Sequence, residues 1–382
     1  MYDPDRAMNR VIVAAVAVAA VVGASVIGWF EVRQAREFRR LLAVGDAALA
    51  HDQTSAAIEA FSGAIALRRD SILGWLKRGD TYRRRGEYAS ALRDLQQATT
   101  IDPTAPRPIE LLGDVRDALG EHARAVELYA RFIALDERAP RVLYKLALAY
   151  YRDGDPTAAM DPVRKALLLD RRLPEAYYLL GLCERDTKHP DLAAEAFVHA
   201  VSLNPAFAAA REELAAVDLA LGRRRDSVEQ LDALAALEPA RTDRLIDLAI
   251  AYARSGRFET AVLTLGRAAE RTPGSLQVYL SIARVWLDLA EEGLDTAAAQ
   301  KAEEALRMAA PRAGASPEFL LLRGRAQLLA NDAGGAERSL QAATAGLPVD
   351  PAAFQYLSTA AERLGHTELA RTSRARYVAL TN

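Results

Sequence analysis

Five histidines are the side chains of this sequence with the widest chemical range, because histidine can transfer protons near neutral pH and can bind metals. His51, His122, His189 and His366 fall near predicted turns between helices, and His199 lies on a predicted helix. None lies three or four residues from another, the spacing at which one helix can hold a metal with two histidines. We therefore expect solvated polar residues and no metal site.

The remaining catalytic signals are also missing from the sequence. Cys183 is the only cysteine, which excludes an intramolecular disulfide and a cysteine-based zinc site but does not indicate a compartment. We find no glycine-rich phosphate loop, no HExxH motif and no nucleophile elbow. The sequence predicts no catalytic residue, no cofactor, no small-molecule substrate and no enzyme activity.

Composition indicates the fold class. The chain has 382 residues, of which 51% are hydrophobic and 7% aromatic, and alanine, leucine and arginine are abundant. This composition is typical of closely packed helices, so we expect an all-α protein. The 49 basic residues are balanced by 51 acidic ones, and without a basic field we expect no nucleic-acid partner.

Residues 11–30, VIVAAVAVAAVVGASVIGWF, contain no charge. As an α-helix they would span about 30 Å, the thickness of a bilayer's hydrocarbon core. Trp29 and Phe30 stand where an aromatic belt would meet the membrane interface. We predict a tail at 1–10, a transmembrane anchor at 11–30 and a juxtamembrane helix at 31–37.

Two features of this segment leave alternatives open. Val22 and Ala24 resemble the small-residue signal of a cleaved signal peptide, although the apolar run continues past that position. Arginines lie on both sides of the span, with a slight excess after it, which favours a cytoplasmic C-terminal part and leaves the periplasmic side open.

The rest of the chain repeats every 34 residues. A first register contains only small residues, with one insertion of seven residues before its last two members: Gly45, Gly79, Gly113, Ala147, Gly181, Ala215, Ala249, Ala283, Gly324 and Ser358. A second register, twelve residues later in each unit, is also small throughout: Ala57, Ala91, Ala125, Ala159, Ala193, Ser227, Ala261, Ala302, Ala336 and Ala370. Two registers that persist through ten units define a repeat in which small residues let two helices approach closely.

These units resemble the tetratricopeptide repeat, whose pattern has an aromatic residue, Leu-Gly, Tyr, a later Ala and Phe, and a closing Pro. The second unit shows it in a single stretch: Trp75, Gly79, Tyr82, Ala91, Leu95 and Pro103. The resemblance implies a superhelical solenoid of ten helix-turn-helix units over residues 38–382, with the insertion near 290–300 forming a longer turn or longer helices. It implies a fold more strongly than a function.

The arginine run 83–85 ends the predicted first helix of unit 2, and the run 223–225 lies in the predicted turn of unit 6. Positive charge is favoured at a helix C-terminus by the helix dipole, which explains both runs without a ligand. Contact with acidic partners or lipid headgroups is the alternative.

In the family that this chain resembles, the first helix of each unit lines a concave groove. The positions that would face inward in units 4 and 5 are Tyr144, Leu148, Tyr151, Tyr178, Leu182 and Arg185. We predict them as partner-binding residues, with core packing or self-association as the alternative. The family's clamp for chaperone tails needs Lys and Asn where Leu76 and Asp80 or Glu110 and Asp114 stand, so that partner is not implied.

The layout resembles bacterial membrane-anchored repeat proteins that assist assembly of envelope complexes. One such type ends in a CxxC metal module, which this chain lacks. We therefore expect a single-pass protein of the bacterial inner membrane, a scaffold or assembly factor that binds peptide or helix segments of proteins or subunits of a membrane complex. A permanent structural subunit of such a complex is the alternative.

Overall fold

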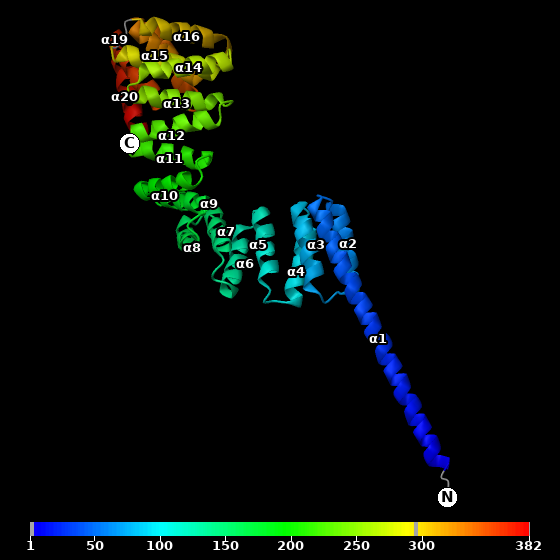
Figure 1. Ribbon diagram of the computed structural model, residues 1–382. Helices are drawn as coiled ribbons and strands as arrows, with labels where there is room; N and C mark the ends of the chain where they lie inside the picture. The colour runs from blue at the N-terminus through cyan, green and yellow to red at the C-terminus, as the bar shows by residue number, and fades with distance from the viewer. Residues whose placement is uncertain (1–3, 294–296, 382) are drawn as a thin grey trace. The chain divides into compact units, whose positions relative to one another are not determined.

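The computed structural model describes residues 4–293 and 297–381, except for the side chains of residues 4–21, 23, 24 and 27. The chain divides into two compact units, residues 1–188 and 189–382, and each is a stack of helices. Within the described residues there are twenty helices (Figure 1). The predicted all-α repeat fold is therefore confirmed.

The bounds of the helices follow the repeat period. The helices of the first unit are α1 (Pro4–Ala50), α2 (Thr54–Leu67), α3 (Ile72–Arg84), α4 (Tyr88–Ile101), α5 (Pro106–Ala118), α6 (His122–Leu135), α7 (Pro140–Arg152), α8 (Pro156–Leu169) and α9 (Pro174–Asp186). Those of the second unit are α10 (Pro190–Leu203), α11 (Ala208–Ala220), α12 (Arg224–Leu237), α13 (Thr242–Arg254), α14 (Phe258–Arg271), α15 (Leu276–Glu291), α16 (Ala298–Ala313), α17 (Pro317–Leu329), α18 (Ala333–Ala345), α19 (Pro351–Leu364) and α20 (Thr367–Thr381).

Within each unit, consecutive helices pack in pairs, such as α3 with α4 and α13 with α14. Each pair also packs on the next one along the chain, and the first helices of neighbouring pairs touch, as α13 and α15 do. A pair buries its apolar side only against its neighbours, so the core is a chain of small clusters along the stack.

Both small-residue registers are buried throughout, as predicted. Gly113 shows the reason, because a Cβ there would lie 2.6 Å from a ring carbon of Tyr129 on the facing helix α6. At Gly324 an added Cβ would lie 2.5 Å from Leu340. The second helix of each pair therefore approaches the first at a distance that a larger side chain would prevent.

From residue 4 onward, the predicted N-terminal segments form one continuous helix, α1, which also serves as the first helix of the first repeat (Figure 1). Its C-terminal part buries Phe38 and Leu42 against α2. Among the residues that the structure describes, no helix has the length and apolar character needed to cross a bilayer. Most side chains of the predicted anchor at 11–30 lie outside the described residues.

The insertion in unit 8 lengthens helices. The helices α15 and α16 have 16 residues each, whereas the preceding pair, α13 and α14, has 13 and 14. This agrees with the extended helices that the sequence left open beside a longer turn.

One of the two arginine runs was explained wrongly. Arg83 and Arg84 end α3, as the helix-dipole explanation requires, and both also pair with Asp80. Arg224 instead begins α12 and Arg223 caps it, so this run lies at a helix N-terminus, where the dipole opposes positive charge. Ion pairing compensates at Arg223, whose guanidinium lies 2.6 Å from Asp191.

Candidate functional site

The six predicted groove residues come from two neighbouring helices of the first unit. On α7, Tyr144, Leu148 and Tyr151 are half-buried and pack beside a core cluster that α9 shares. On α9, Leu182 is buried and Tyr178 and Arg185 are half-buried. We call these six residues the α7–α9 face. The three residues of α7 therefore contribute to packing between repeats.

Polar contacts between the two helices tie this face together. The hydroxyl of Tyr151 donates a hydrogen bond to Asp186 Oδ2 at 2.8 Å, and Arg185 pairs with the same carboxylate at 2.8 Å. Burial, together with the hydrogen bond to Asp186, raises the pKa of Tyr151 to about 12. The hydroxyl therefore stays protonated and remains a hydrogen-bond donor at neutral pH.

A second polar network links α5, α6 and α7. Lys145 Nζ lies 2.7 Å from Glu110 Oε1 and 2.7 Å from Asp114 Oδ1, and the Tyr129 hydroxyl donates to Asp114 Oδ1 at 2.8 Å. Burial opposes ionisation of Glu110, but hydrogen bonds and charge from Lys145 and Arg107 outweigh it and lower its pKa. Burial first, and then the charge of Asp114, raises the pKa of Tyr129.

This network was missed in the sequence, where Glu110 and Asp114 counted only as a failed chaperone clamp. The available signal was an opposite charge, Lys145, about one repeat later. In this network, therefore, charges on the first helices join two successive repeats.

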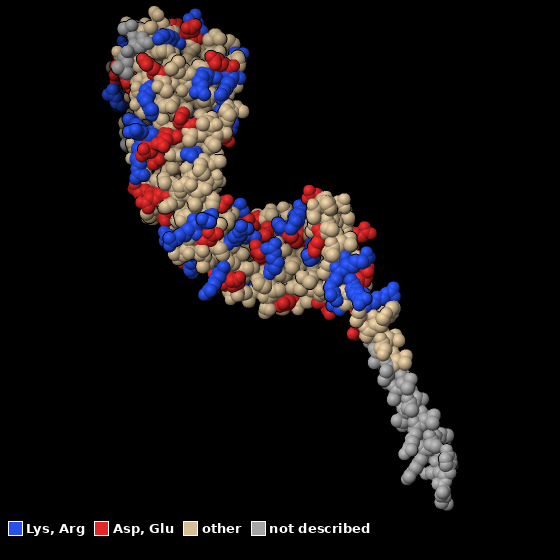
Figure 2. Space-filling model, viewed as in Figure 1, with Lys and Arg blue, Asp and Glu red and all other residues tan. Residues whose placement is uncertain are grey.

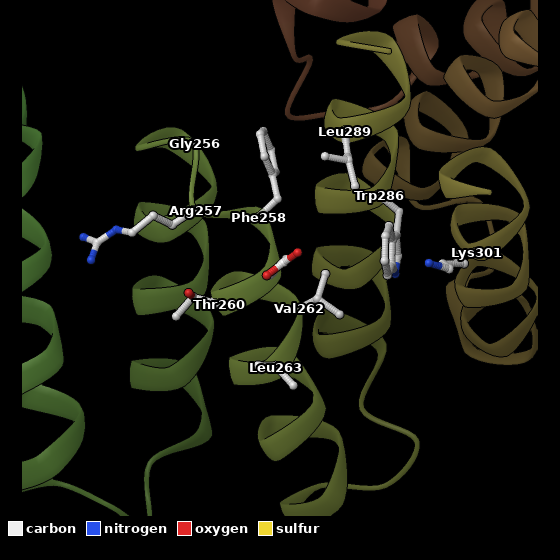
Figure 3. A pocket seen from close by; sticks show the side chains of 10 residues that line it. Gly256, Arg257, Phe258, Thr260, Val262, Leu263, Trp286, Leu289 and Lys301 are labelled. Carbon is white, nitrogen blue, oxygen red and sulfur yellow. The ribbon is translucent and has the colours of Figure 1, made fainter. Parts of the chain in front are cut away.

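The second unit contains a groove of about 800 Å³ between α14 and α16, with α15 as its floor (Figure 3). Its lining residues are Gly256, Arg257, Phe258, Glu259, Thr260, Val262, Leu263, Trp286, Leu289 and Lys301. We call it the α14–α16 groove. Phe258 and Val262 come from α14, Trp286 and Leu289 from α15, and Lys301 from α16, which is one of the helices lengthened by the insertion.

Leu263 is the unusual residue of this groove, because it is 71% exposed. The other nine units place a charged residue or threonine at the same register position: Glu59, Arg93, Glu127, Asp161, Glu195, Glu229, Glu304, Arg338 and Thr372. Only unit 7 presents a large apolar side chain at this solvated position. Comparing units at this register would have revealed it from the sequence.

Trp286 gives the groove an aromatic floor. It is half-buried, and Lys301 Nζ lies 4.1 Å from its ring centroid, within the range of a cation–π interaction. The cation is thereby held at the edge of an apolar surface. The arrangement suits an apolar group that also carries negative charge.

A groove at the equivalent place two units earlier has opposite chemistry. It lies along α10, α11 and α12, has a volume of about 410 Å³, and presents Glu195, Asp218 and Asp226 at the registers of Leu263, Trp286 and Lys301. We call it the α10–α12 groove. Burial raises the pKa of Asp218. Because the backbone plan is shared, the difference between the two grooves lies in their side chains.

Two of the histidines contact nearby carboxylates. His122 Nδ1 lies 2.8 Å from Asp117 and His366 Nδ1 lies 2.7 Å from Glu337. Across the part of the chain that the structure describes, no three His, Cys, Asp or Glu side chains are grouped to hold a metal.

Comparison with known sequences finds profile matches in three parts of the chain. The sequence profile of the tetratricopeptide repeat matches residues 42–106 and 111–174. A profile described as a bacterial transcriptional activator domain matches residues 188–278. None of the curated proteins matches the chain.

Solved structures show similar folds. The C-terminal part of a TPR repeat-containing protein from Cytophaga hutchinsonii is 15% identical, with 64% of this chain and 98% of that chain covered and a TM-score of 0.51. MamA from Desulfovibrio magneticus RS-1 is 21% identical, with coverages of 44% and 94% and a TM-score of 0.42. YrrB, described as a TPR protein with an unusual peptide-binding site, is 20% identical, with coverages of 48% and 94% and a TM-score of 0.43. The Cytophaga structure shows a similar fold, and the repeat profile supports a protein–protein interaction scaffold in general terms.

Proposed function

We propose that this tetratricopeptide-repeat protein is a membrane-anchored scaffold that helps to assemble a membrane or envelope protein complex, and that it binds a partner segment in the α14–α16 groove. One observation carries the binding proposal: Leu263 is exposed and apolar at a register position where the other units have polar residues.

The energetics favour a partner that covers Leu263. Full burial of a leucine side chain stabilises a complex by about 1.5–3 kcal/mol. Trp286, which lines the same groove, adds a large, rigid surface of the type that often dominates binding energy. The partner therefore presents at least one bulky apolar side chain to this groove.

Charge restricts the partner further. Arg257 and Lys301 line the groove together with a single acid, Glu259. A second copy of the same groove, facing it across a two-fold axis, would bring like cations towards one another. We therefore propose an amphipathic segment of another protein, with acidic residues beside its apolar ones.

The α7–α9 face is the second proposed binding surface, in line with the sequence prediction. Tyr144, Tyr151 and Tyr178 keep part of their rings exposed. Their joint replacement by alanine would abolish recovery of a partner bound there, and unchanged recovery would exclude this face as the binding site.

The anchor proposal depends on the uncharged segment 11–30, with Trp29 and Phe30 at the membrane interface. We propose the bacterial inner membrane, with the repeats on the cytoplasmic side. Labelling a cysteine placed on an outer turn, in a chain without Cys183, would report the side in intact cells. Because the sequence has no basic excess, we propose protein partners and no nucleic acid.

The groove is tested by titrating the full chain, in mild detergent, with two synthetic amphipathic helices. Both carry leucines along one face, and the flanking residues are glutamates in one peptide and lysines in the other. We expect the acidic peptide to bind about ten-fold more tightly. Leu263→Glu should weaken its binding by about ten-fold, and this variant should fold because five other units have glutamate there.

The α10–α12 groove provides the matched control, because Glu195→Leu changes the equivalent residue in the opposite direction. We expect this variant to bind the peptide within about two-fold of the parent chain. Equal binding by Leu263→Glu and the parent would refute the groove. A change of oligomeric state in Leu263→Glu would instead identify a second copy as the occupant.

A permanent structural subunit is the alternative function. Gentle solubilisation and co-purification separate the two proposals, because a stoichiometric partner supports the subunit and substoichiometric mixtures support the assembly factor.

A further inference from the structure

A dense group of arginines follows the proposed anchor. Arg33, Arg36, Arg39 and Arg40 lie on α1 within the ten residues after Phe30, and all four are exposed. Arg33 lies over the ring of Trp29, with 5.4 Å between the guanidinium carbon and the ring centroid.

The first repeat brings two more arginines to the same place. Arg68 and Arg69 follow the end of α2 and are exposed. Gln34 Nε2 donates a hydrogen bond to the carbonyl oxygen of Leu67 at 2.7 Å, and Arg68 lies 5.6 Å from the ring centroid of Phe38. Both contacts hold the end of α2 against the arginine-bearing part of α1.

We call these six arginines the basic collar. The acids near them in sequence are Glu31, Glu37 and Asp70, and Glu37 pairs with Arg40 at 2.6 Å. Cations therefore outnumber carboxylates two to one. Figure 2 shows basic side chains gathered where α1 meets the first repeats.

The collar lies at the depth of lipid headgroups if the anchor ends at Phe30. At 1.5 Å per residue, Arg33 lies about 5 Å and Phe38 about 12 Å beyond Phe30 along the helix axis. The headgroup layer is roughly 5–7 Å thick on each side, and charge acts over a further Debye length of about 8–10 Å. Exposed apolar residues precede the collar on α1, including Val26 at 60% and Trp29 at 61%.

We infer that the basic collar binds anionic phospholipid headgroups and thereby holds the first repeat against the membrane surface. The inference rests on the proposed anchor, which ends where the collar begins. Each arginine near an anionic surface strengthens association by roughly five-fold. Arg68 and Arg69 belong to the first repeat and not to α1. Their contact with headgroups would therefore hold the repeat, and not only α1, at the membrane surface.

Trp75 is a built-in reporter for this contact, since its Nε1 donates a hydrogen bond to the carbonyl oxygen of Arg69 at 2.9 Å. The chain has three tryptophans, so Trp29→Phe together with Trp286→Phe leaves Trp75 alone. The full chain with these changes is reconstituted into vesicles of phosphatidylcholine, or of equal parts phosphatidylcholine and phosphatidylglycerol. Both contain a lipid with a spin-labelled headgroup that quenches nearby tryptophan.

We expect stronger quenching of Trp75 in the anionic vesicles, and we expect high salt to remove the difference. Arg68→Gln with Arg69→Gln should bring quenching down to the level in neutral vesicles while the anchor stays inserted. Arg84→Gln with Arg85→Gln is the matched control, because it changes two adjacent arginines at the opposite end of α3 and should leave quenching unchanged. Circular dichroism of each variant verifies folding.

Equal quenching in the two vesicle types, or full quenching in the Arg68→Gln, Arg69→Gln variant, would overturn the collar while leaving the anchor intact. Extraction with alkaline carbonate tests the anchor, and a chain that it removes from vesicles refutes the anchor.

If such a chain still binds anionic vesicles through Arg68 and Arg69, the collar proposal holds without the anchor. If it binds neither vesicle type, both proposals fall. Binding of polyglutamate by the collar without quenching by lipid would assign it to an acidic protein and overturn the lipid proposal.

Discussion

The α7–α9 face with its neighbouring network and the α14–α16 groove use similar helix pairs for different purposes. In the first unit, Lys145 and Tyr151 donate hydrogen bonds to carboxylates of adjacent repeats. In the second unit, Leu263 and Trp286 present apolar surface that the described helices do not cover fully. The two surfaces thus differ in one respect. Side chains of the first unit bond to the next repeat, whereas those of the α14–α16 groove leave apolar surface exposed.

This difference separates stability from binding. Removing a residue that joins repeats leaves a carboxylate without its partner, so the free energy of unfolding falls. Removing an exposed apolar residue leaves no polar group without a partner, so only the affinity for a binding partner falls. Four substitutions test the distinction, and they are arranged from the largest expected effect on stability to the smallest.

Gly113→Leu tests the packing beneath the polar network of the first unit. The new side chain would collide with Tyr129, since even a Cβ would lie 2.6 Å from its ring, and we expect a loss of about 3 kcal/mol. The midpoint of urea unfolding of the full chain measures it. Gly120→Ala is the control, because no atom lies within 4 Å of a Cβ there and only its positive φ costs about 1 kcal/mol. Equal losses of stability in the two variants would contradict the close approach of α5 and α6 at Gly113.

Lys145→Met tests the network itself. Glu110 and Asp114 would lose their shared cation. Because Glu110 is buried but Asp114 and Lys145 are half-buried, we expect a loss of about 2 kcal/mol at neutral pH. The folded-state pKa of Glu110 is lowered, so its stabilisation is present above the usual value of 4.5 and is lost as the pH falls through the folded value. The variant should therefore lose less stability on acidification than the parent. Parallel unfolding curves at neutral and acidic pH measure this, and equal acid sensitivity would show that Lys145 does not set this pKa.

Tyr151→Phe tests whether the α7–α9 face joins repeats through hydroxyl groups. It removes the hydrogen bond to Asp186 and keeps the ring, so we expect a loss of about 0.5–1 kcal/mol at this partly exposed place. Tyr144→Phe serves as the comparison on the same face. If Tyr151→Phe changes partner recovery without changing the unfolding midpoint, the hydroxyl belongs to a binding surface.

Leu263→Glu should change the unfolding midpoint least, by less than about 0.5 kcal/mol, because the residue is 71% exposed. Leu265→Glu, two residues later on the same helix, is the control. Leu265 is fully buried, so the introduced charge should prevent folding of this part of the stack. A large loss for Leu263→Glu would show that Leu263 packs within the protein, and would remove the basis of the groove.

Much of the fold could be predicted from the sequence. Gly79 and Ala91 belong to registers that must be small for the helices to meet, and this requirement recurs every 34 residues where it can be read directly. The candidate sites were predicted less well. Tyr144 and Tyr151 were placed on a shared face by their positions in the repeat, but their partial burial depends on neighbours that the pattern does not specify. Arg224 was placed in the turn of unit 6, with a C-terminal dipole as its explanation, because the pattern does not fix where α12 begins.

The sequence by itself determined the repeat period, the pairing of helices and the small contact positions, because each follows from spacing within about one repeat. Tertiary structure alone decided that Lys145 joins Glu110 to Asp114, that Lys301 lies over Trp286, and that Arg68 meets Phe38. These contacts join different helices, and their geometry depends on the distance and angle at which those helices pack. Spacing along the chain does not contain that information.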